Sequence, residues 1–167
     1  MSKPETGFPS AVDEQIFREV LSSLVSGVSI VTTQRENASF GVTASSVTSL
    51  SADPASILVC LNQRLAITDV ISETGVFAVN VLGEGHGDLA IQFSTSHEDK
   101  FRGIDVTSDR LGNPILVEAL AHLECRVIDR KDFATHAIFI ALVESAASRT
   151  GSPLPYFRSS FGRFEAD

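Results

Sequence analysis

Closely spaced hydroxyl groups and small side chains make residues 41–51 a candidate ligand-binding segment. This segment has the sequence GVTASSVTSLS, and Pro54 and the apolar run 57–61 follow it closely. Small side chains let a flat polar ring approach the main chain, whose N–H and C=O groups can then hydrogen-bond the edge of the ring. Thr and Ser hydroxyls can reach a polyhydroxyl chain. The alternative is a half-exposed β-strand, because β-branched and hydroxyl residues suit a strand face.

Two further segments carry groups that could bind an anion. Arg64 follows an apolar run directly, so its guanidinium could contact a phosphate, with the Thr68 hydroxyl close to a helix N-terminus. Residues 97–101 mix both charges, and Lys100 could be a second anion contact. The alternative for both segments is a solvated turn with surface charges.

His136 opens an apolar run and is the histidine best placed for chemistry. Its imidazole could hydrogen-bond a substrate at a pocket rim, or it could be a strand-edge histidine satisfied locally. His86, His97 and His122 lack a paired metal-binding spacing, so we predict no metal. The serines lie in no Gly-x-Ser-x-Gly motif, so the sequence offers no nucleophile motif for a hydrolase.

The whole-chain properties narrow the class of protein. The 167 residues, 43% hydrophobic and 20% charged, predict a single domain over residues 1–167, with a flexible N-terminal segment at 1–10. The net charge of -8 argues against nucleic-acid and anionic-membrane partners. The sequence start resembles no signal peptide and no apolar run spans a bilayer, which predicts a cytoplasmic protein. Cys60 and Cys125 lie in apolar runs, and we expect both to be reduced and structural.

The elements that would position these groups follow from hydrophobic periodicity. Ser10 is the expected N-cap of a first helix whose apolar residues recur at helical spacing up to Leu24, with Gly27 as its stop. Strands are predicted at 28–33, 39–50, 57–62, 76–82, 122–128 and 136–143, further helices at 65–71 and 86–93, a long polar loop at 94–113 and a returning tail at 154–158. Many strands and few helices favour an antiparallel barrel over an alternating βαβ sheet.

Taken in order, these segments resemble the small flavin reductases of two-component flavin monooxygenases, the 4-hydroxyphenylacetate 3-monooxygenase reductase type. The resemblance runs from Phe17 to Phe164 and rests on VSIVTT at 28–33, the 41–51 segment, LVCLN at 58–62, FAVNVL at 77–82, GNPIL at 112–116, ALAHLEC at 119–125, THAIF at 135–139 and LPYFR at 154–158. It implies a mainly β fold, an FMN-binding split β-barrel with Greek-key connections and a few flanking helices. It also implies a homodimer with FMN or FAD near the subunit interface.

The resemblance assigns roles to individual residues. The isoalloxazine and ribityl groups would border Thr43, Ala44, Ser45, Ser46, Val47 and Thr48; the phosphate would lie near Asn62, Gln63, Arg64 and Thr68; the flavin would be flanked by Lys100 and Phe101; and the pocket would be closed by Phe157, Arg158 and Phe161. His136 would touch the nicotinamide. The segment 63–66 departs from many relatives because it carries one guanidinium and no hydroxyl.

The function implied is hydride transfer from C4 of NAD(P)H to N5 of FMN or FAD, supplying reduced flavin to a separate monooxygenase. The cofactors carry this chemistry and the protein orients them, so His136 would position the nicotinamide without exchanging a proton. The alternatives are a flavin-binding carrier or sensor without turnover and a protein like pyridoxamine-phosphate oxidase on a related barrel. The choices between FMN and FAD and between NADH and NADPH stay open.

Overall fold

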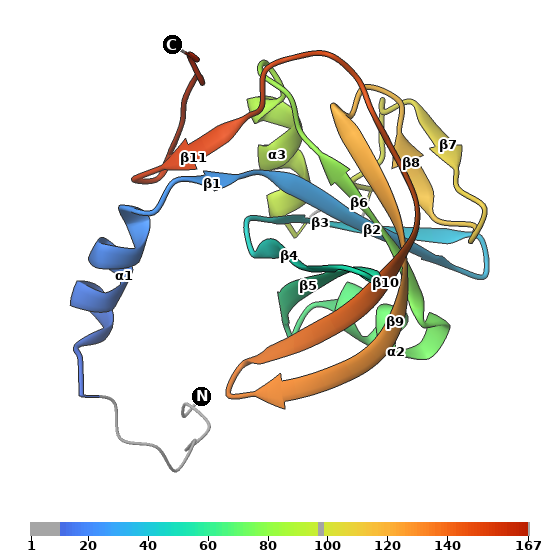
Figure 1. Ribbon diagram of the computed structural model, residues 1–167, viewed down its shortest axis with the longest axis horizontal. Helices are drawn as coiled ribbons and strands as arrows, with labels where there is room; N and C mark the ends of the chain where they lie inside the picture. Colours follow the sequence, from blue (N-terminus) through green and yellow to red (C-terminus); the bar gives the residue numbers. More distant parts are fainter. Residues whose placement is uncertain (1–10, 97–98, 167) are drawn as a thin grey trace.

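β-Branched and aromatic runs form most of the regular structure, as predicted. The computed structural model describes residues 11–96 and 99–166 (Figure 1). Within these ranges the elements are α1 Glu14–Ser22, β1 Ser26–Gly27, β2 Ser29–Arg35, β3 Ala38–Ala44, β4 Val47–Ala52, β5 Ala55–Asn62, α2 Ala66–Thr74, β6 Val76–Val81, α3 Gly87–Ser94, β7 Val106–Ser108, β8 Pro114–Leu116, β9 Ala121–Phe133, β10 His136–Ser148, β11 Pro155–Phe157 and β12 Ser160–Phe161. The predicted flexible segment 1–10 lies outside the described residues.

A seven-stranded antiparallel sheet is the framework of the molecule, with the strand order β3-β2-β6-β9-β10-β5-β4. Its outermost strands, β3 and β4, are consecutive in the sequence, so the sheet curls until its two edges meet at residues 45–46. No ladder joins those two edges among the strand pairs of the described residues. The result is a curled sheet that is open along one seam, in agreement with the mainly β fold expected from the sequence.

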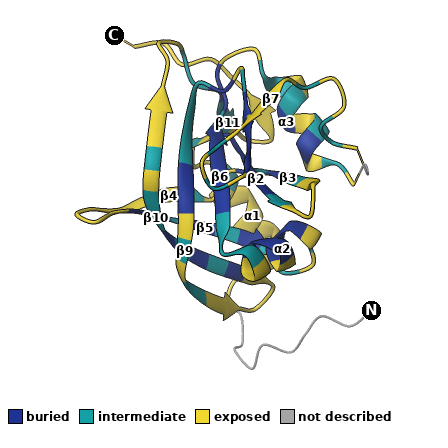
Figure 2. Ribbon diagram, turned by 90° about the vertical axis from the view of Figure 1, so that its right-hand side faces the viewer, coloured by how far each residue is buried: buried dark blue, intermediate teal, exposed yellow. Residues whose placement is uncertain are grey.

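Strand alternation explains where the core lies. On β10, Ala137, Phe139 and Ala141 are buried, while the residues between them are half-buried. β2 is buried over its first five residues, because both of its faces are covered. Figure 2 shows these buried segments gathered inside the curl of the sheet, with α2 packed at one end and α3 at the other.

The segment expected to be one strand at 39–50 is in fact two, which corrects the prediction. Ser45 and Ser46 form a turn between β3 and β4, which lie at opposite edges of the sheet. The Ser46 hydroxyl donates to the Cys60 carbonyl at 2.8 Å, and the Cys60 N–H donates to the Ser46 carbonyl at 3.1 Å. Hydroxyl-rich sequences suit turns as well as strand faces, so periodicity could not locate this break.

The predicted polar loop 94–113 contains regular structure as well. β7 pairs with β8, and Asp109 closes the connection by accepting hydrogen bonds from the N–H groups of Leu111 and Asn113 at 2.8 and 2.7 Å. The buried Asn80 side chain ties β8 to the sheet, because its Oδ1 accepts from the Leu116 N–H at 2.8 Å and its Nδ2 donates to the Ile30 carbonyl at 3.1 Å.

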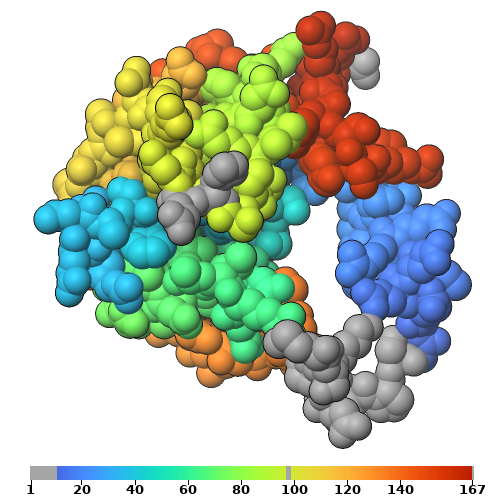
Figure 3. All heavy atoms as spheres, turned by 180° about the vertical axis from the view of Figure 1, so that it is seen from behind, coloured from blue at the N-terminus to red at the C-terminus, as the bar shows by residue number. Residues whose placement is uncertain are grey.

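Both chain ends form an arm outside the curled sheet, composed here of α1, β1, β11 and β12. Asp13, and not Ser10, is the N-cap of α1, and the helix ends at Ser22 rather than near Gly27. β1 pairs with β11, and the Arg158 N–H donates to the Ser22 carbonyl at 3.0 Å. No residue of α1 is buried, and Figure 3 shows the helix standing off the strands across an open gap. Among the described residues, no helix has the length and apolar character that a membrane crossing requires.

Candidate functional site

Strand β3 is the common wall of two adjoining cavities that contain several of the predicted site residues. The first, here called the Lys100 cavity, has a volume of about 570 Å³ and is lined by Ala38, Ser39, Phe40, Gly41, Val42, Arg64, Leu65, Ala66, Ile67, Ser94, Thr95, Ser96, Lys100 and Phe101. The second, here called the Phe161 cavity, has a volume of about 630 Å³ and is lined by Val28, Thr43, Ser45, Ala90, Ile91, Ser94, Tyr156, Ser159, Ser160 and Phe161. Ser94 lines both, so the two cavities are neighbours.

Gly41 makes the close packing behind the Lys100 cavity possible. A Cβ atom at this position would lie 2.4 Å from Cε1 of Phe93 and 3.3 Å from Cζ of Phe101. The two phenylalanine rings contact each other edge to face, with centroids 5.0 Å apart. Thr43, two residues further along β3, donates from its hydroxyl to the Ala90 carbonyl at 2.6 Å. β3 and α3 are therefore held together along both cavities.

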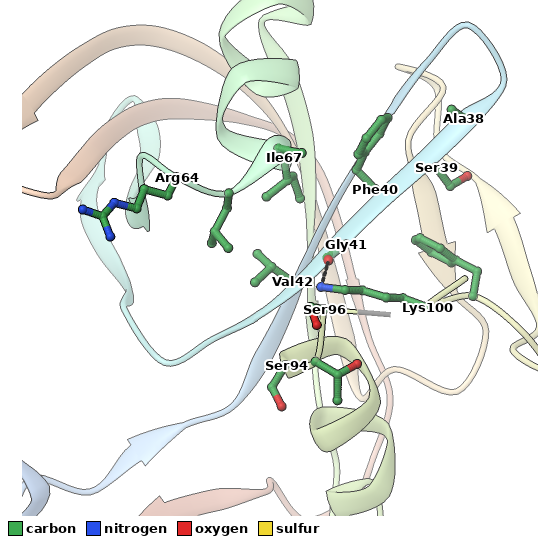
Figure 4. Close-up of a pocket in the computed structure, with 14 residues that line it drawn as sticks. Ala38, Ser39, Phe40, Gly41, Val42, Arg64, Ile67, Ser94, Ser96 and Lys100 are labelled. Atoms are coloured by element: carbon green, nitrogen blue, oxygen red, sulfur yellow. Dashed lines mark hydrogen bonds between the residues drawn. The ribbon is translucent and has the colours of Figure 1, made fainter. Parts of the chain in front are cut away.

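Lys100 brings a positive charge into the first cavity. Its Nζ donates to the Phe93 carbonyl at 3.0 Å and to the Gly41 carbonyl at 3.2 Å, the latter bond drawn in Figure 4. The ion pairs of the described residues include none to Lys100, and burial lowers the pKa of its ammonium. An ammonium has three N–H donors, and these two carbonyls accept from it among the described residues. An anion bound beside this group would offset its loss of hydration.

Arg64 lines the same cavity from the opposite side. It follows β5 in a turn that is held by its own polar groups: Oδ1 of Asn62 accepts from the Arg64 N–H at 3.0 Å, and the Thr68 hydroxyl donates to the Asn62 carbonyl at 2.8 Å. Figure 4 shows the Arg64 side chain extending away from Lys100, on the exposed side of the cavity. Thr68 is buried and lines neither cavity. The structure thus brings Arg64 and Lys100 to one cavity and assigns Thr68 to the support of the turn.

His136 lies at the first position of β10, exposed and outside both cavities. Its Nδ1 is 2.9 Å from the Thr135 hydroxyl, and its carbonyl accepts from Nε2 of Gln63 at 3.0 Å. These contacts are those expected of a strand-edge histidine whose hydrogen bonds are made to nearby residues. They also join His136 to the turn that carries Arg64, since His136 faces Asn62 across the β10–β5 ladder.

The other predicted cofactor residues divide between the cavities and the surrounding surface. Phe101 lines the Lys100 cavity, and Thr43, Ser45 and Phe161 line the Phe161 cavity, whereas Ala44, Ser46, Val47, Thr48, Asn62, Gln63, Phe157 and Arg158 line neither. The Arg158 guanidinium lies 5.2 Å from the centroid of the Phe157 ring on the arm.

Sequence analysis missed several lining residues. Ser94 joins the two cavities, and Tyr156 contacts Phe161 with ring centroids 5.3 Å apart. Ser39 and Ser96 add hydroxyl groups to the Lys100 cavity. The three hydroxyl residues at 94–96, at and just after the end of α3, were the feature of the sequence that could have indicated these lining residues.

The chemistry of the two cavities favours binding over acid–base catalysis. Among the described residues, the titratable side chains that line them are Arg64, Lys100 and Tyr156, and none of these is a carboxylate or an imidazole. The residues described by the structure include no cluster of three or more His, Cys, Asp or Glu able to hold a metal ion. A cationic cavity beside an aromatic and hydroxyl-lined one suits a ligand with an anionic end and a flat ring. The absence of a side chain at Gly41 serves the packing of β3 on α3, because the Phe93 ring occupies the space that a Cβ would fill.

Residues 21–165 match the family model described as the flavin reductase like domain. The chain therefore belongs to the flavin reductase family, as the resemblance predicted. It is 44% identical over 153 residues to the reductase component of a 4-nitrophenol 4-monooxygenase/4-nitrocatechol 2-monooxygenase of Rhodococcus opacus, covering 92% of this chain and 82% of that protein.

Two further relatives are named as NADH-dependent reductases of a flavin, one of FMN and one of FAD. The chain is 35% identical over 146 residues to the FMN reductase (NADH) RutF 2 of Methylorubrum extorquens (strain PA1), covering 86% of this chain and 85% of the relative. The NADH:FAD oxidoreductase SgcE6 of Streptomyces globisporus, solved with NAD and FAD fragments, superposes with a TM-score of 0.88 at 28% identity, over 95% of this chain and 99% of that chain. These relatives are flavin reductases, and the first of them is the reductase component of a monooxygenase.

Proposed function

We propose that this protein reduces FMN or FAD with NADH or NADPH and supplies the reduced flavin to a separate monooxygenase. The observation that carries the proposal is the pairing of the Lys100 cavity with the Phe161 cavity across β3, in a member of the flavin reductase family. Bound flavin and nicotinamide supply the hydride chemistry themselves. The protein binds both and fixes their distance and orientation. Among the described residues, the titratable groups that line the two cavities are Arg64, Lys100 and Tyr156, which suit binding.

The phosphate end of the flavin is assigned to the Lys100 cavity. Lys100 offers an ammonium charge paired by no carboxylate among the described residues, and the exposed Arg64, which lines the same cavity, would turn toward the phosphate. Asn62, Gln63 and Thr68 act here by holding the turn that presents Arg64. These roles agree with the sequence of the turn at 63–66, which carries one guanidinium and no hydroxyl.

The ring end of the flavin is assigned to β3 and the turn after it. Thr43 and Ser45 line the Phe161 cavity, and the main chain through Ala44, Ser46, Val47 and Thr48 continues along the seam of the sheet. Phe161 closes the cavity from the arm, supported by Phe157 and Arg158 in the same hairpin. His136, which lies outside both cavities beside the turn of Gln63 and Arg64, would contact the nicotinamide.

A homodimer is part of the proposal, with the apolar face of α1 covered by a second copy of the chain. The apolar residues of this face and of the turn that follows it are all exposed, namely Ile16, Phe17, Val20 and Leu21 on α1 and Leu24 just after the helix. Exposing a contiguous apolar helix face to water is unfavourable, and such a face typically marks an interaction site. Because the arm that carries α1 also carries Phe161, a second copy docked on α1 would support one wall of the site. We further propose a cytoplasmic location, where NAD(P)H and a partner monooxygenase are available.

The test is a flavin reductase assay with a binding control. Purified protein is mixed with NADH or NADPH and with FMN or FAD, and the nicotinamide absorbance is followed together with flavin binding. We expect flavin-dependent loss of the nicotinamide absorbance, with a preference among the four combinations that defines the substrates. Tight flavin binding without nicotinamide oxidation would contradict the reductase proposal and would identify a flavin carrier or sensor.

A further inference from the structure

Gln92, on the last turn of α3, holds the main chain on both sides of Phe101. Its Nε2 donates to the Lys100 carbonyl at 2.8 Å and to the Arg102 carbonyl at 3.2 Å. Gln92 lines neither the Lys100 cavity nor the Phe161 cavity. Its side-chain amide reaches the candidate site through the peptide groups that flank Phe101.

Three contacts together attach this short segment to α3. The Phe101 ring packs on Phe93, the Lys100 ammonium donates to the Phe93 carbonyl, and the Gln92 amide binds the main chain between them. The contacts of the Phe101 ring and of the Lys100 ammonium are made by side chains that line the cavity. The Gln92 amide, in contrast, bonds the main-chain carbonyl of Lys100. The position of the Lys100 Cα therefore depends on Gln92, while the ammonium is directed by Phe93 and Gly41.

The chemistry of a primary amide suits this task. Its NH₂ group has two N–H donors and can serve two carbonyl oxygens at once. A long lysine side chain loses much rotamer freedom when its ammonium is fixed at a ligand. A backbone that is already fixed leaves fewer arrangements to lose, so an anion binds more tightly to the same ammonium.

We propose that Gln92 is a positioning residue for binding of the flavin phosphate, acting through Lys100. This inference rests on the proposed function, in which the Lys100 cavity receives the phosphate. It predicts that the donors of Gln92 matter for FMN, which has a phosphate, and are immaterial for riboflavin, which has none.

The test compares Kd values for FMN and riboflavin in a set of variants. Gln92→Met keeps the length of the side chain and removes its donors, and we expect about a 3- to 10-fold weaker Kd for FMN with an unchanged Kd for riboflavin. Gln92→Arg supplies N–H donors again, and we expect it to restore most of the FMN affinity. The control is Asp88→Asn, an exposed position on the same helix, for which neither Kd changes.

A double variant separates positioning from general stability. In a Lys100→Ala background, Gln92→Met is expected to have no further effect on the Kd for FMN, because the group that it positions is gone. Equal weakening of FMN and riboflavin by Gln92→Met, or no weakening of either, would overturn the inference. If Lys100→Ala leaves the ratio of the two Kd values unchanged, the phosphate assignment of the proposed function is wrong, and the inference falls with it.

Discussion

At the scale of single residues, Lys100 illustrates how context decides between a solvated charge and a functional one. In the sequence it stands among other charged residues, where solvation is the ordinary outcome. In the structure its ammonium reaches carbonyls of α3 and β3, and burial lowers its pKa. A lowered pKa means that the charge is lost at a lower pH than for an exposed lysine. Phosphate binding at this group is therefore expected to weaken as the pH rises through the alkaline range.

The role of His136 is a prediction that a single substitution can test. We expect His136→Ala to slow flavin reduction or raise the KM for NAD(P)H by up to about 100-fold, the cost of losing the alignment of reacting atoms. The Kd for flavin should change little. Stopped-flow reduction and a flavin titration measure the two quantities, and His122→Ala on β9 is a matched control outside the proposed site. Reduction by His136→Ala at the parent's rate at low NADH would leave His136 as a strand-edge residue.

The cysteines confirm the expectation of free thiols. Cys60 and Cys125 are unpaired in the structure, on β5 and β9 respectively. Burial, followed by the charges of Asp109 and Glu124, raises the pKa of the Cys125 thiol to about 12. At neutral pH this thiol is protonated, and only the thiolate is a strong nucleophile. Cys125 therefore acts as a small apolar residue of the core.

At the scale of elements, β3 is the strand on which both cavities depend. Gly41→Ala is expected to destabilise the fold by about 1–3 kcal/mol, the usual cost of adding a methyl group to a closely packed site. The new Cβ would collide with the Phe93 ring and displace α3, so FMN affinity is expected to fall as well. Urea unfolding and an FMN titration measure these effects.

The matched control for this prediction is Gly27→Ala. A Cβ at Gly27 would have no heavy atom within 4 Å, and Gly27, like Gly41, lies in a strand. If Gly41→Ala proves as stable as Gly27→Ala and binds FMN equally well, the close packing of β3 on α3 does not shape the site.

At the scale of the whole molecule, the arm links the proposed dimer to the proposed site. Val20 of α1 and Leu24 just after the helix are 61% and 65% exposed, so replacing both by Glu removes apolar surface from the interface with little effect on the sheet. We expect a dimeric mass for the parent by light scattering and a monomeric mass for the Val20→Glu, Leu24→Glu variant. Flavin binding is expected to weaken in the variant, because Phe161 belongs to the same arm.

Glu19→Lys is the control for this substitution, since helical spacing places Glu19 on the opposite side of α1. It changes charge on the helix without touching the apolar face, and the dimer is expected to persist. A parent protein that is monomeric at micromolar concentration, with full reductase activity, would contradict the dimer proposal.

The sequence by itself determined the class of the fold, the kind of ligand and most element positions. Continuous apolar runs at 57–61 and 137–143 predicted β5 and the first part of β10, because short runs of this kind are typical of buried strands. The family resemblance, confirmed by the match over residues 21–165, predicted a flavin reductase. Patterns of this kind lie within a few neighbouring residues, so strands and motifs can be predicted from them without the folded structure.

Only the tertiary structure decided which of these residues meet. Arg64 and Lys100, and Thr43 and Phe161, are far apart in the sequence, yet each pair lines one cavity. Thr68 was equally plausible as a phosphate ligand and is buried beneath its turn. The reason is physical: these outcomes depend on the curl of a seven-stranded sheet and on contacts such as those of Gly41 with Phe93. Long-range contacts of this kind leave no periodicity in the sequence, so they become visible only when the chain is folded.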